Sequence, residues 1–425
     1  MSQQKQQWGA IIIMIALFAM IAFVTNLCSP MAVIVKNDFG ASNVLAQIGN
    51  YGNFIAYLVM GIPSGMLIAK YGYKKTALLG LVIGVVGILV QWMSGHVGKE
   101  SAFLVYLIGA FISGFTMCIL NAVVNPMLNL LGGGGNKGNQ LIQTGGVFNS
   151  AAAVAVYIIM GALIGDATKA HIADATPALM IALAIFVIGF IGIAMTKIEE
   201  PEQAPVDVSL IKGALRYRHF VLGILAIFLY MCIEVGTPTY VLQYLTAPLE
   251  EGGKGMDAGI VGLIVAVYWL MMLIGRFVGS AIGGKVSSRA MITTVSTASI
   301  LLVLFGMFAP TDTTVNVPGI DWANLNVIWA EVPVGIFAFL LVGLCTSVMW
   351  GGIFNMAVEG LGKYTAIASG IFMTMVFGCA VMVAIQGWVA DLTDYMTSYW
   401  VVVASAAYIL FYALIGSRVS SSNQN

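Results

Sequence analysis

The sequence has 425 residues, of which 60% are hydrophobic and only 8% carry a charged side chain. A soluble globular protein has about 25% charged residues, so this chain has too few charges to cover a large surface in water. A soluble enzyme, a nucleic-acid binder and a disordered scaffold are therefore excluded. The 18 basic and 18 acidic residues balance, which gives no reason to expect a polyanionic partner. The chain is expected to lie in a lipid bilayer and to bind no nucleic acid.

The five cysteines all fall inside apolar stretches and lie far apart in the sequence. Cysteines in such places behave as small hydrophobic residues, and their spacing fits neither a disulfide framework nor a metal site. We therefore expect neither a metal nor an organic cofactor.

Apolar runs divide the chain into about twelve segments, each long enough for the roughly 20 residues that a helix needs to cross the bilayer. They begin near residues 8, 44, 74, 101, 140, 175, 217, 257, 288, 334, 365 and 396. The longest polar break lies near the middle and contains the Pro- and Glu-rich sequence IEEPEQAPVD. The sequence therefore predicts an all-α membrane protein, with one six-helix bundle in residues 1–197, a cytoplasmic linker in 198–216 and a second six-helix bundle in 217–425.

The basic residues indicate how the chain is oriented. If the N-terminus is cytoplasmic, fourteen of the eighteen Lys and Arg residues fall in cytoplasmic segments. Such an excess of basic residues is typical of cytoplasmic loops. Both termini are therefore expected in the cytoplasm, and the same count assigns Arg276 to a cytoplasmic segment.

Two of the cytoplasmic loops, about half a chain apart, resemble one another. Lys70 and Lys74 follow the second span, and Lys285 and Arg289 follow the eighth span with the same spacing. Matching loops in two six-helix halves are typical of transporters built from internal repeats. We expect the lysines of these loops and Arg276 to stabilise one facing state. The alternative is that any short cytoplasmic loop is rich in Lys and Gly.

Glu234 lies near the middle of the seventh span, in the sequence FLYMCIEVGTPTYVLQYL, with no basic residue within a turn of it. An ionisable group at this depth is costly, which makes it a functional candidate. We interpret it as a ligand for the substrate or for a coupling cation. The alternative is an acid that holds two helices together through hydrogen bonds. Tyr240, downstream on the same span, supplies a further polar group.

The fourth span carries Asn121, Asn125 and Asn129 at intervals of four residues, which places the three amides on one helical face. Amides both donate and accept hydrogen bonds, as sugar hydroxyls do, so such a row suits a polyol. Hydrogen bonding between helices is the alternative, and it is the preferred interpretation for Asn129. Further candidate substrate contacts on other spans are Asn26, Gln143, Asn149, Thr346, Trp350 and Gln386.

Several segments, in the same order, resemble the major facilitator superfamily and, within it, the fucose permease and glucose–galactose permease family. They are the loop PSGMLIAKYGYKK, the segment LNAVVNPMLNLLG of span four, VFNS at 147–150, the seventh span, GRFVGSAIGGKVSSR, and the stretch from Gly343 to Asp391. The resemblance runs from about residue 20 to residue 395. It implies two helical bundles that transport a sugar through a central cavity by alternating access, usually as proton symport.

Two acids of that family are absent from this chain. The resemblance places an Asp in span one and a Glu in span four, for substrate binding and protonation, where this sequence has Asn26 and Asn121. An Asn can hydrogen-bond a sugar, but it cannot carry a proton. In the fifth span, Gly146 stands where the family has a Gln. The hypothesis is therefore that ion coupling, by H⁺ or Na⁺, runs through Glu234.

The sequence thus predicts a cation-coupled symporter of a hexose or deoxyhexose, acting as a monomer in a bacterial inner membrane. The alternative is an uncoupled facilitator or exporter of another small neutral solute, because both family acids are missing. An enzyme is not expected, since no paired acids, His-containing cluster or Ser–His arrangement lies at membrane depth in the sequence.

Overall fold

The computed structural model describes residues 7–39, 43–164, 171–200, 208–256, 258–321 and 326–419. In this part of the chain, ten helical segments are long and apolar enough to cross a membrane. One of them, Gly52–Ser94, has 43 residues and is long enough for two passes.

The first half of the chain contains six spans when α2 is counted as two and α4, a helix of 30 residues that is not among the ten segments above, is counted as one. Its elements are α1 (Trp8–Phe39), α2 (Asn43–Ser94), α3 (Lys99–Leu131), α4 (Gly135–Ile164), the 3₁₀ turn η1 (Ile172–Ala175) and α5 (Thr176–Met195). Helix α2 is a pair of spans, because its backbone leaves helical geometry at Gly72, with φ 85° and ψ 172°. Glycine adopts a positive φ without steric cost. Just after this break, the Glu200 carboxylate accepts hydrogen bonds from the backbone N–H groups of Tyr73 and Lys74, at 2.9 and 2.8 Å.

Between the halves lies the short helix α6 (Val208–Leu215), inside the segment 198–216 that we predict as a linker. Residues 201–207 of that segment are outside the described residues. The domain boundaries at residues 197 and 217 stay predictions.

The second half also contains six spans. Its helical elements are α7 (Arg218–Met231), the π-turn η2 (Cys232–Gly236), α8 (Thr237–Thr246), η3 (Leu249–Glu251), α9 (Ala258–Ile282), α10 (Ser288–Phe308), α11 (Val334–Val358), η4 (Gly362–Tyr364), α12 (Thr365–Thr374), η5 (Met375–Phe377), α13 (Gly378–Leu392), η6 (Thr397–Tyr399), α14 (Trp400–Phe411) and the π-turn η7 (Tyr412–Gly416). The π-turn η2 joins α7 and α8 into one span, and η5 joins α12 and α13 into another. The predicted fold of about twelve spans is therefore confirmed.

A β-hairpin between α10 and α11 was not predicted. Strand β1 (Thr314–Asp321) pairs antiparallel with β2 (Asn326–Pro333), so that Val317 lies opposite Ala330. The valines and isoleucines of the two strands favour extended structure. A count of apolar runs cannot show the hairpin, because it is a short connection beyond the ends of the membrane helices.

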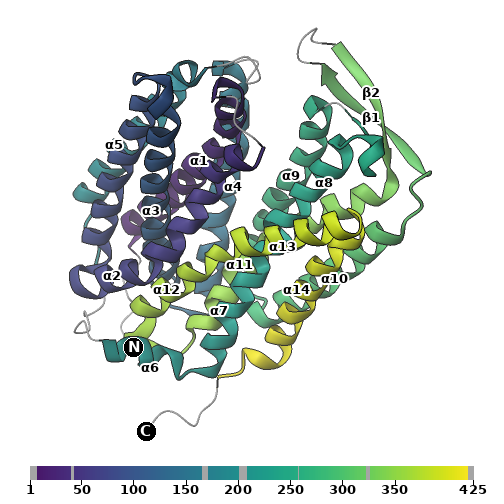
Figure 1. Ribbon diagram of the computed structural model, residues 1–425. Coiled ribbons are helices and arrows are strands. Elements are labelled where there is room, and N and C mark those ends of the chain that lie inside the picture. Colours follow the sequence, from purple (N-terminus) through teal and green to yellow (C-terminus); the bar gives the residue numbers. More distant parts are fainter. Residues whose placement is uncertain are drawn as a thin grey trace.

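The two halves form separate bundles that lie side by side (Figure 1). Their ribbons meet at the end of the molecule that holds both termini and diverge toward the end that carries the hairpin. We call these ends the terminus side and the hairpin side. Within the bundles, large buried side chains such as Phe186 and Phe339 fill the space between the helices. The structure thus shows one facing state, in which the halves join on the terminus side.

Helices α2 and α12, from different halves, approach each other very closely. A Cβ on Gly370 would lie 2.5 Å from the carbonyl oxygen of Gly61 and 2.7 Å from the backbone nitrogen of Gly65. Small residues permit this spacing, as they do at other helix interfaces in membranes. Closure of the terminus side therefore requires a residue without a Cβ at position 370.

Proline in α3 creates a further contact between the halves. Pro126 has no N–H, so it leaves the carbonyl oxygen of Ala122 without its usual helical donor. The hydroxyl of Ser369, on α12, donates to this oxygen at 2.9 Å. A hydrogen-bond acceptor freed in one half is therefore satisfied by the other half.

Another line of contacts runs between α4 of the first half and α9 of the second. Gln140 Nε2 donates to the carbonyl oxygen of Ser280 at 3.1 Å, and the hydroxyls of Thr144 and Ser280 are 2.6 Å apart. Nearby, Asn129 of α3 donates to Oδ1 of Asn355 on α11 at 2.7 Å. These groups are all neutral, so this part of the closed interface depends on packing and neutral hydrogen bonds.

Candidate functional site

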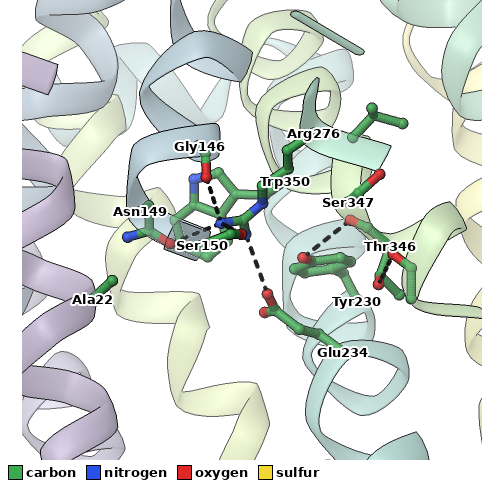
Figure 2. Close-up of polar contacts among 12 residues, drawn as sticks. Ala22, Gly146, Asn149, Ser150, Tyr230, Glu234, Arg276, Thr346, Ser347 and Trp350 are labelled. Atoms are coloured by element: carbon green, nitrogen blue, oxygen red, sulfur yellow. Dashed lines mark hydrogen bonds and ion pairs between the residues drawn. The ribbon is translucent and has the colours of Figure 1, made fainter. Parts of the chain in front are cut away.

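Arg276 connects the two bundles through polar contacts (Figure 2). It belongs to α9 and is 8% exposed. Its Nη1 lies within hydrogen-bonding distance of three acceptors on α4: the carbonyl oxygen of Gly146 at 3.1 Å, Oδ1 of Asn149 at 2.7 Å and Oγ of Ser150 at 2.9 Å. Because α9 lies in the second half and α4 in the first, a single charged side chain joins them.

The other terminal nitrogen of Arg276 faces Glu234. Nη2 and Oε1 of Glu234 are 3.6 Å apart, and the two side chains are 9% and 14% exposed. Glu234 lies on the π-turn η2, and such turns inside helices often occur at functional sites. At this distance the two groups form an ion pair rather than a close hydrogen bond. The pair carries no net charge.

The structure corrects one expectation about Arg276 and adds a partner for Glu234. The predicted place of Arg276 in a cytoplasmic segment is wrong, because this residue lies inside the apolar helix α9, which continues to Ile282, and it is 8% exposed. No basic residue lies within a turn of Glu234 along the chain, but Arg276 of another helix pairs with it. A search within one helical turn cannot find a pair that forms between two different helices.

The amides of α3 connect helices in this facing state. Asn121 Nδ2 donates to the hydroxyl of Tyr57 at 2.8 Å, and Asn125 Nδ2 donates to the carbonyl oxygen of Asn121 at 2.9 Å. Trp350, on α11 of the second half, donates from Nε1 to Oδ1 of Asn125 at 3.1 Å. Both amides therefore take part in hydrogen bonds between helices, Asn121 with Tyr57 on α2 and Asn125 with Trp350 on α11. Their roles as substrate contacts stay predictions.

Aromatic rings lie next to the ion pair. The ring centroids of Tyr230 and Trp350 are 6.3 Å apart, and both residues appear beside Arg276 and Glu234 in Figure 2. Tyr230 and Ser150 are not among the residues predicted from the sequence. Tyr230 lies one helical turn before Glu234 on the same span, and Ser150 directly follows the predicted residue Asn149. Their closeness to predicted residues in the sequence is the signal that could have identified both.

Two further predicted residues contact the centre of the protein from different sides. Gln143 of α4 donates from Nε2 to the carbonyl oxygen of Val348 on α11 at 3.1 Å, which is another contact between the halves. Thr346 lies inside the second half, where its hydroxyl is 3.1 Å from the hydroxyl of Tyr268. In this state, Gln143 belongs to the closed interface and Thr346 to the packing behind the ion pair.

Three predicted residues make contacts away from the ion pair. The hydroxyl of Tyr240 donates to the carbonyl oxygen of Val383 at 3.0 Å. Gln386 is 0% exposed inside the second half. Asn26 donates from Nδ2 to the carbonyl oxygen of Ala22 on its own helix, at 2.8 Å. Their roles as substrate contacts stay predictions.

The predicted loop residues differ in their surroundings. Nζ of Lys74 donates to the carbonyl oxygens of Ala194 and Thr196, at 3.0 and 2.7 Å, so these contacts stay within the first half. Lys70 and Lys285 are exposed. Arg276, in contrast, donates hydrogen bonds from the second half to the first.

A comparison with known families decides the classification. The model of the Major Facilitator Superfamily matches residues 13–384. The chain belongs to this superfamily. It is therefore a multi-pass membrane protein, in agreement with its apolar helices.

Two relatives and one solved structure show what this facilitator-superfamily protein is similar to. A glucose/galactose transporter of Brucella abortus is 29% identical over 425 residues, which cover 98% of this chain and 96% of the relative. An L-fucose-proton symporter of Escherichia coli is 22% identical over 406 residues, covering 88% and 85%. The crystal structure of the transporter FucP in the outward conformation has a TM-score of 0.78 at 20% identity and covers 96% of this chain and 99% of that chain. The structural likeness supports the shared fold.

Proposed function

We propose that the protein is a secondary transporter of a neutral sugar, a hexose or deoxyhexose, that works by alternating access. The observation that carries this proposal is the neutral Arg276–Glu234 pair, which lies with Asn149 where the two halves meet. The names of the relatives, a glucose/galactose transporter and an L-fucose-proton symporter, support a sugar as substrate. The transporter is proposed to act as a monomer in a bacterial inner membrane.

The chemistry of the site suits a neutral polyol. Arg276 and Asn149 supply donors, Glu234 supplies acceptors, and a sugar hydroxyl can pair with either kind of group. Trp350 and Tyr230 add aromatic surface for the apolar face of a pyranose ring. Because the ion pair already has zero net charge, an anionic sugar would bring an unpaired charge into a largely buried place. We therefore expect a neutral sugar rather than a sugar phosphate or uronate.

The facing state follows from the same assignment. With both termini in the cytoplasm, the terminus side faces the cytoplasm and the hairpin side faces outward. The halves join on the terminus side, so this state corresponds to an outward-facing carrier. Rocking of the two bundles around the midplane would then expose the site to the other side.

Counterflow in proteoliposomes tests the substrate class, because it needs no ion gradient. We expect labelled glucose, galactose or fucose to exchange against the same unlabelled sugar. Asn149→Ala should lower this exchange at least tenfold, since it removes a group next to the ion pair. Asn316→Ala, on the exposed hairpin, is the matched control and should leave exchange unchanged. Exchange of nucleosides but of no hexose or deoxyhexose would contradict the proposal.

We further propose that transport is cation-coupled symport and that H⁺ or Na⁺ binds at Glu234. An inward gradient of one of these ions should drive sugar above its equilibrium level in proteoliposomes, and Glu234→Gln should abolish this accumulation. Glu331→Gln, at an exposed position of the hairpin, serves as the control. Accumulation that persists in Glu234→Gln would refute the role of Glu234. An uncoupled facilitator, the alternative function, would show counterflow but no accumulation with either ion.

A further inference from the structure

Arg276 has acceptors in both halves of the protein. Oδ1 of Asn149 and Oγ of Ser150, at 2.7 and 2.9 Å, belong to the first half. Glu234, at 3.6 Å, belongs to the second half, as Arg276 itself does. We infer that Arg276 is a latch between the bundles and that the charge on Glu234 decides whether the latch can open. This inference rests on the proposed transport function and adds how the coupling ion controls the movement of the bundles.

The position of Arg276 in the contact between α4 and α9 supports a latch. The two helices run antiparallel. Starting from the terminus side, Gln140 packs against Gly284, where an added Cβ would lie 2.7 Å from Oε1 of Gln140. Next, the hydroxyls of Thr144 and Ser280 are 2.6 Å apart. Arg276 lies one helical turn further along α9 and makes the deepest of these polar contacts. Opening of the terminus side must therefore break the bonds of Arg276 to α4.

Breaking those bonds has a cost that depends on Glu234. A guanidinium at membrane depth that loses its acceptors is strongly unfavourable unless a counter-charge remains. Glu234 moves with Arg276, because both lie in the second half, so an ionised Glu234 keeps the pair neutral after α4 has moved away. With a cation bound to Glu234, Arg276 has no such counter-charge and stays bonded to α4. Sugar hydroxyls next to Arg276 can then replace the lost acceptors.

Other titratable side chains close to Glu234 do not change this balance. They are Tyr57 on α2, Tyr230 on α7, Tyr268 on α9 and Cys379 on α13. Phenols and thiols carry no charge at neutral pH in their ordinary state. Among the described neighbours of Glu234, Arg276 is thus the residue that carries a full positive charge and forms an ion pair with it.

The latch gives a rule for coupling. The empty carrier, with ionised Glu234, can open on the terminus side, and so can the carrier that holds both sugar and cation. The carrier that holds the cation alone cannot, because Arg276 lacks a counter-charge. Such a rule prevents leakage of the coupling ion without sugar.

The test uses Glu234→Gln, which imitates the neutral, cation-occupied carboxyl group. We expect this variant to keep sugar counterflow, because the sugar-loaded carrier still opens. Net downhill sugar flux from the terminus side to the hairpin side should fall at least tenfold, because the empty carrier must then reopen the terminus side and the latch prevents this. The double variant Glu234→Gln/Arg276→Met lacks both the latch and a sugar donor, so its sugar flux should stay low while its empty carrier opens again, which the labelling described below detects. Undiminished flux in Glu234→Gln would overturn the inference.

A labelling readout reports the latch without transport. Ser280→Cys places a thiol in the contact with Thr144, which is half-buried between α4 and α9, so a maleimide should react with it faster once these helices separate. Without sugar, Glu234→Gln should slow this labelling at least tenfold, and the double variant should restore it. The protein without Ser280→Cys corrects for the native cysteines. Equal labelling in all backgrounds would refute the latch. Absence of counterflow with every sugar would instead refute the proposed substrate, because the labelling needs none.

Discussion

Gly370→Ala is expected to shift the protein away from the state shown here and to lower counterflow at least fivefold. The new Cβ would lie 2.5 Å from the carbonyl oxygen of Gly61 and 2.7 Å from the nitrogen of Gly65. Both are backbone atoms, which cannot turn aside as the end of a side chain can. Overpacking of this kind costs roughly 1–3 kcal/mol. That free energy changes the ratio of two facing states by about 5–150-fold.

The measurement combines counterflow with the labelling of Ser280→Cys. Labelling should become faster in Gly370→Ala, because the terminus side opens more often. Gly262→Ala is the matched control: Gly262 also lies in a membrane helix, but a Cβ there meets nothing within 4 Å. If both variants show the same labelling and the same counterflow, the close approach of α2 and α12 does not limit closure.

Arg276→Met is expected to destabilise the protein more than loss of any surface charge does. The substitution leaves Glu234, 14% exposed, without the guanidinium 3.6 Å away. It also removes the donor next to Oδ1 of Asn149 and Oγ of Ser150. Breaking a buried ion pair by removal of one partner costs about 3–5 kcal/mol, because the other charge stays buried. Thermal unfolding in detergent should therefore occur at a clearly lower temperature.

The double variant separates this explanation from loss of packing. Glu234→Gln/Arg276→Met has no unpaired charge and should regain much of the lost unfolding temperature, since neutral replacements of buried pairs are often tolerated. Arg216→Met, at an exposed position, controls for the loss of a positive charge. A double variant no more stable than Arg276→Met would show that the charge of Glu234 is not the cause.

Local sequence patterns were sufficient for most of the fold. Each span is a run of apolar residues, and the bilayer forces such a run to satisfy its backbone hydrogen bonds as a helix. Even the break between the second and third spans follows from Gly72 in the loop KYGYKK, where the structure has φ 85°. The hairpin was missed because its strands lie outside the bilayer, where this constraint does not apply.

The candidate site was only partly visible in the sequence. Glu234 stood out because a carboxyl group in an apolar span is costly, and Asn149 because the VFNS element resembles a known family. Tyr230 and Ser150 were passed over, since a Tyr or Ser in a membrane helix is common. The predicted cytoplasmic place of Arg276 is wrong, because helix α9 continues for six residues beyond it, to Ile282.

By itself, the sequence determined the number of spans, the two halves and the presence of an acid at membrane depth. These properties depend on the solvent around each segment, and that information is local. Only the tertiary structure decided that Glu234 faces Arg276, that Arg276 also contacts α4, and that the halves join on the terminus side. Such contacts depend on how helices from distant parts of the chain pack. They also change between facing states, so one sequence must be compatible with more than one set of them.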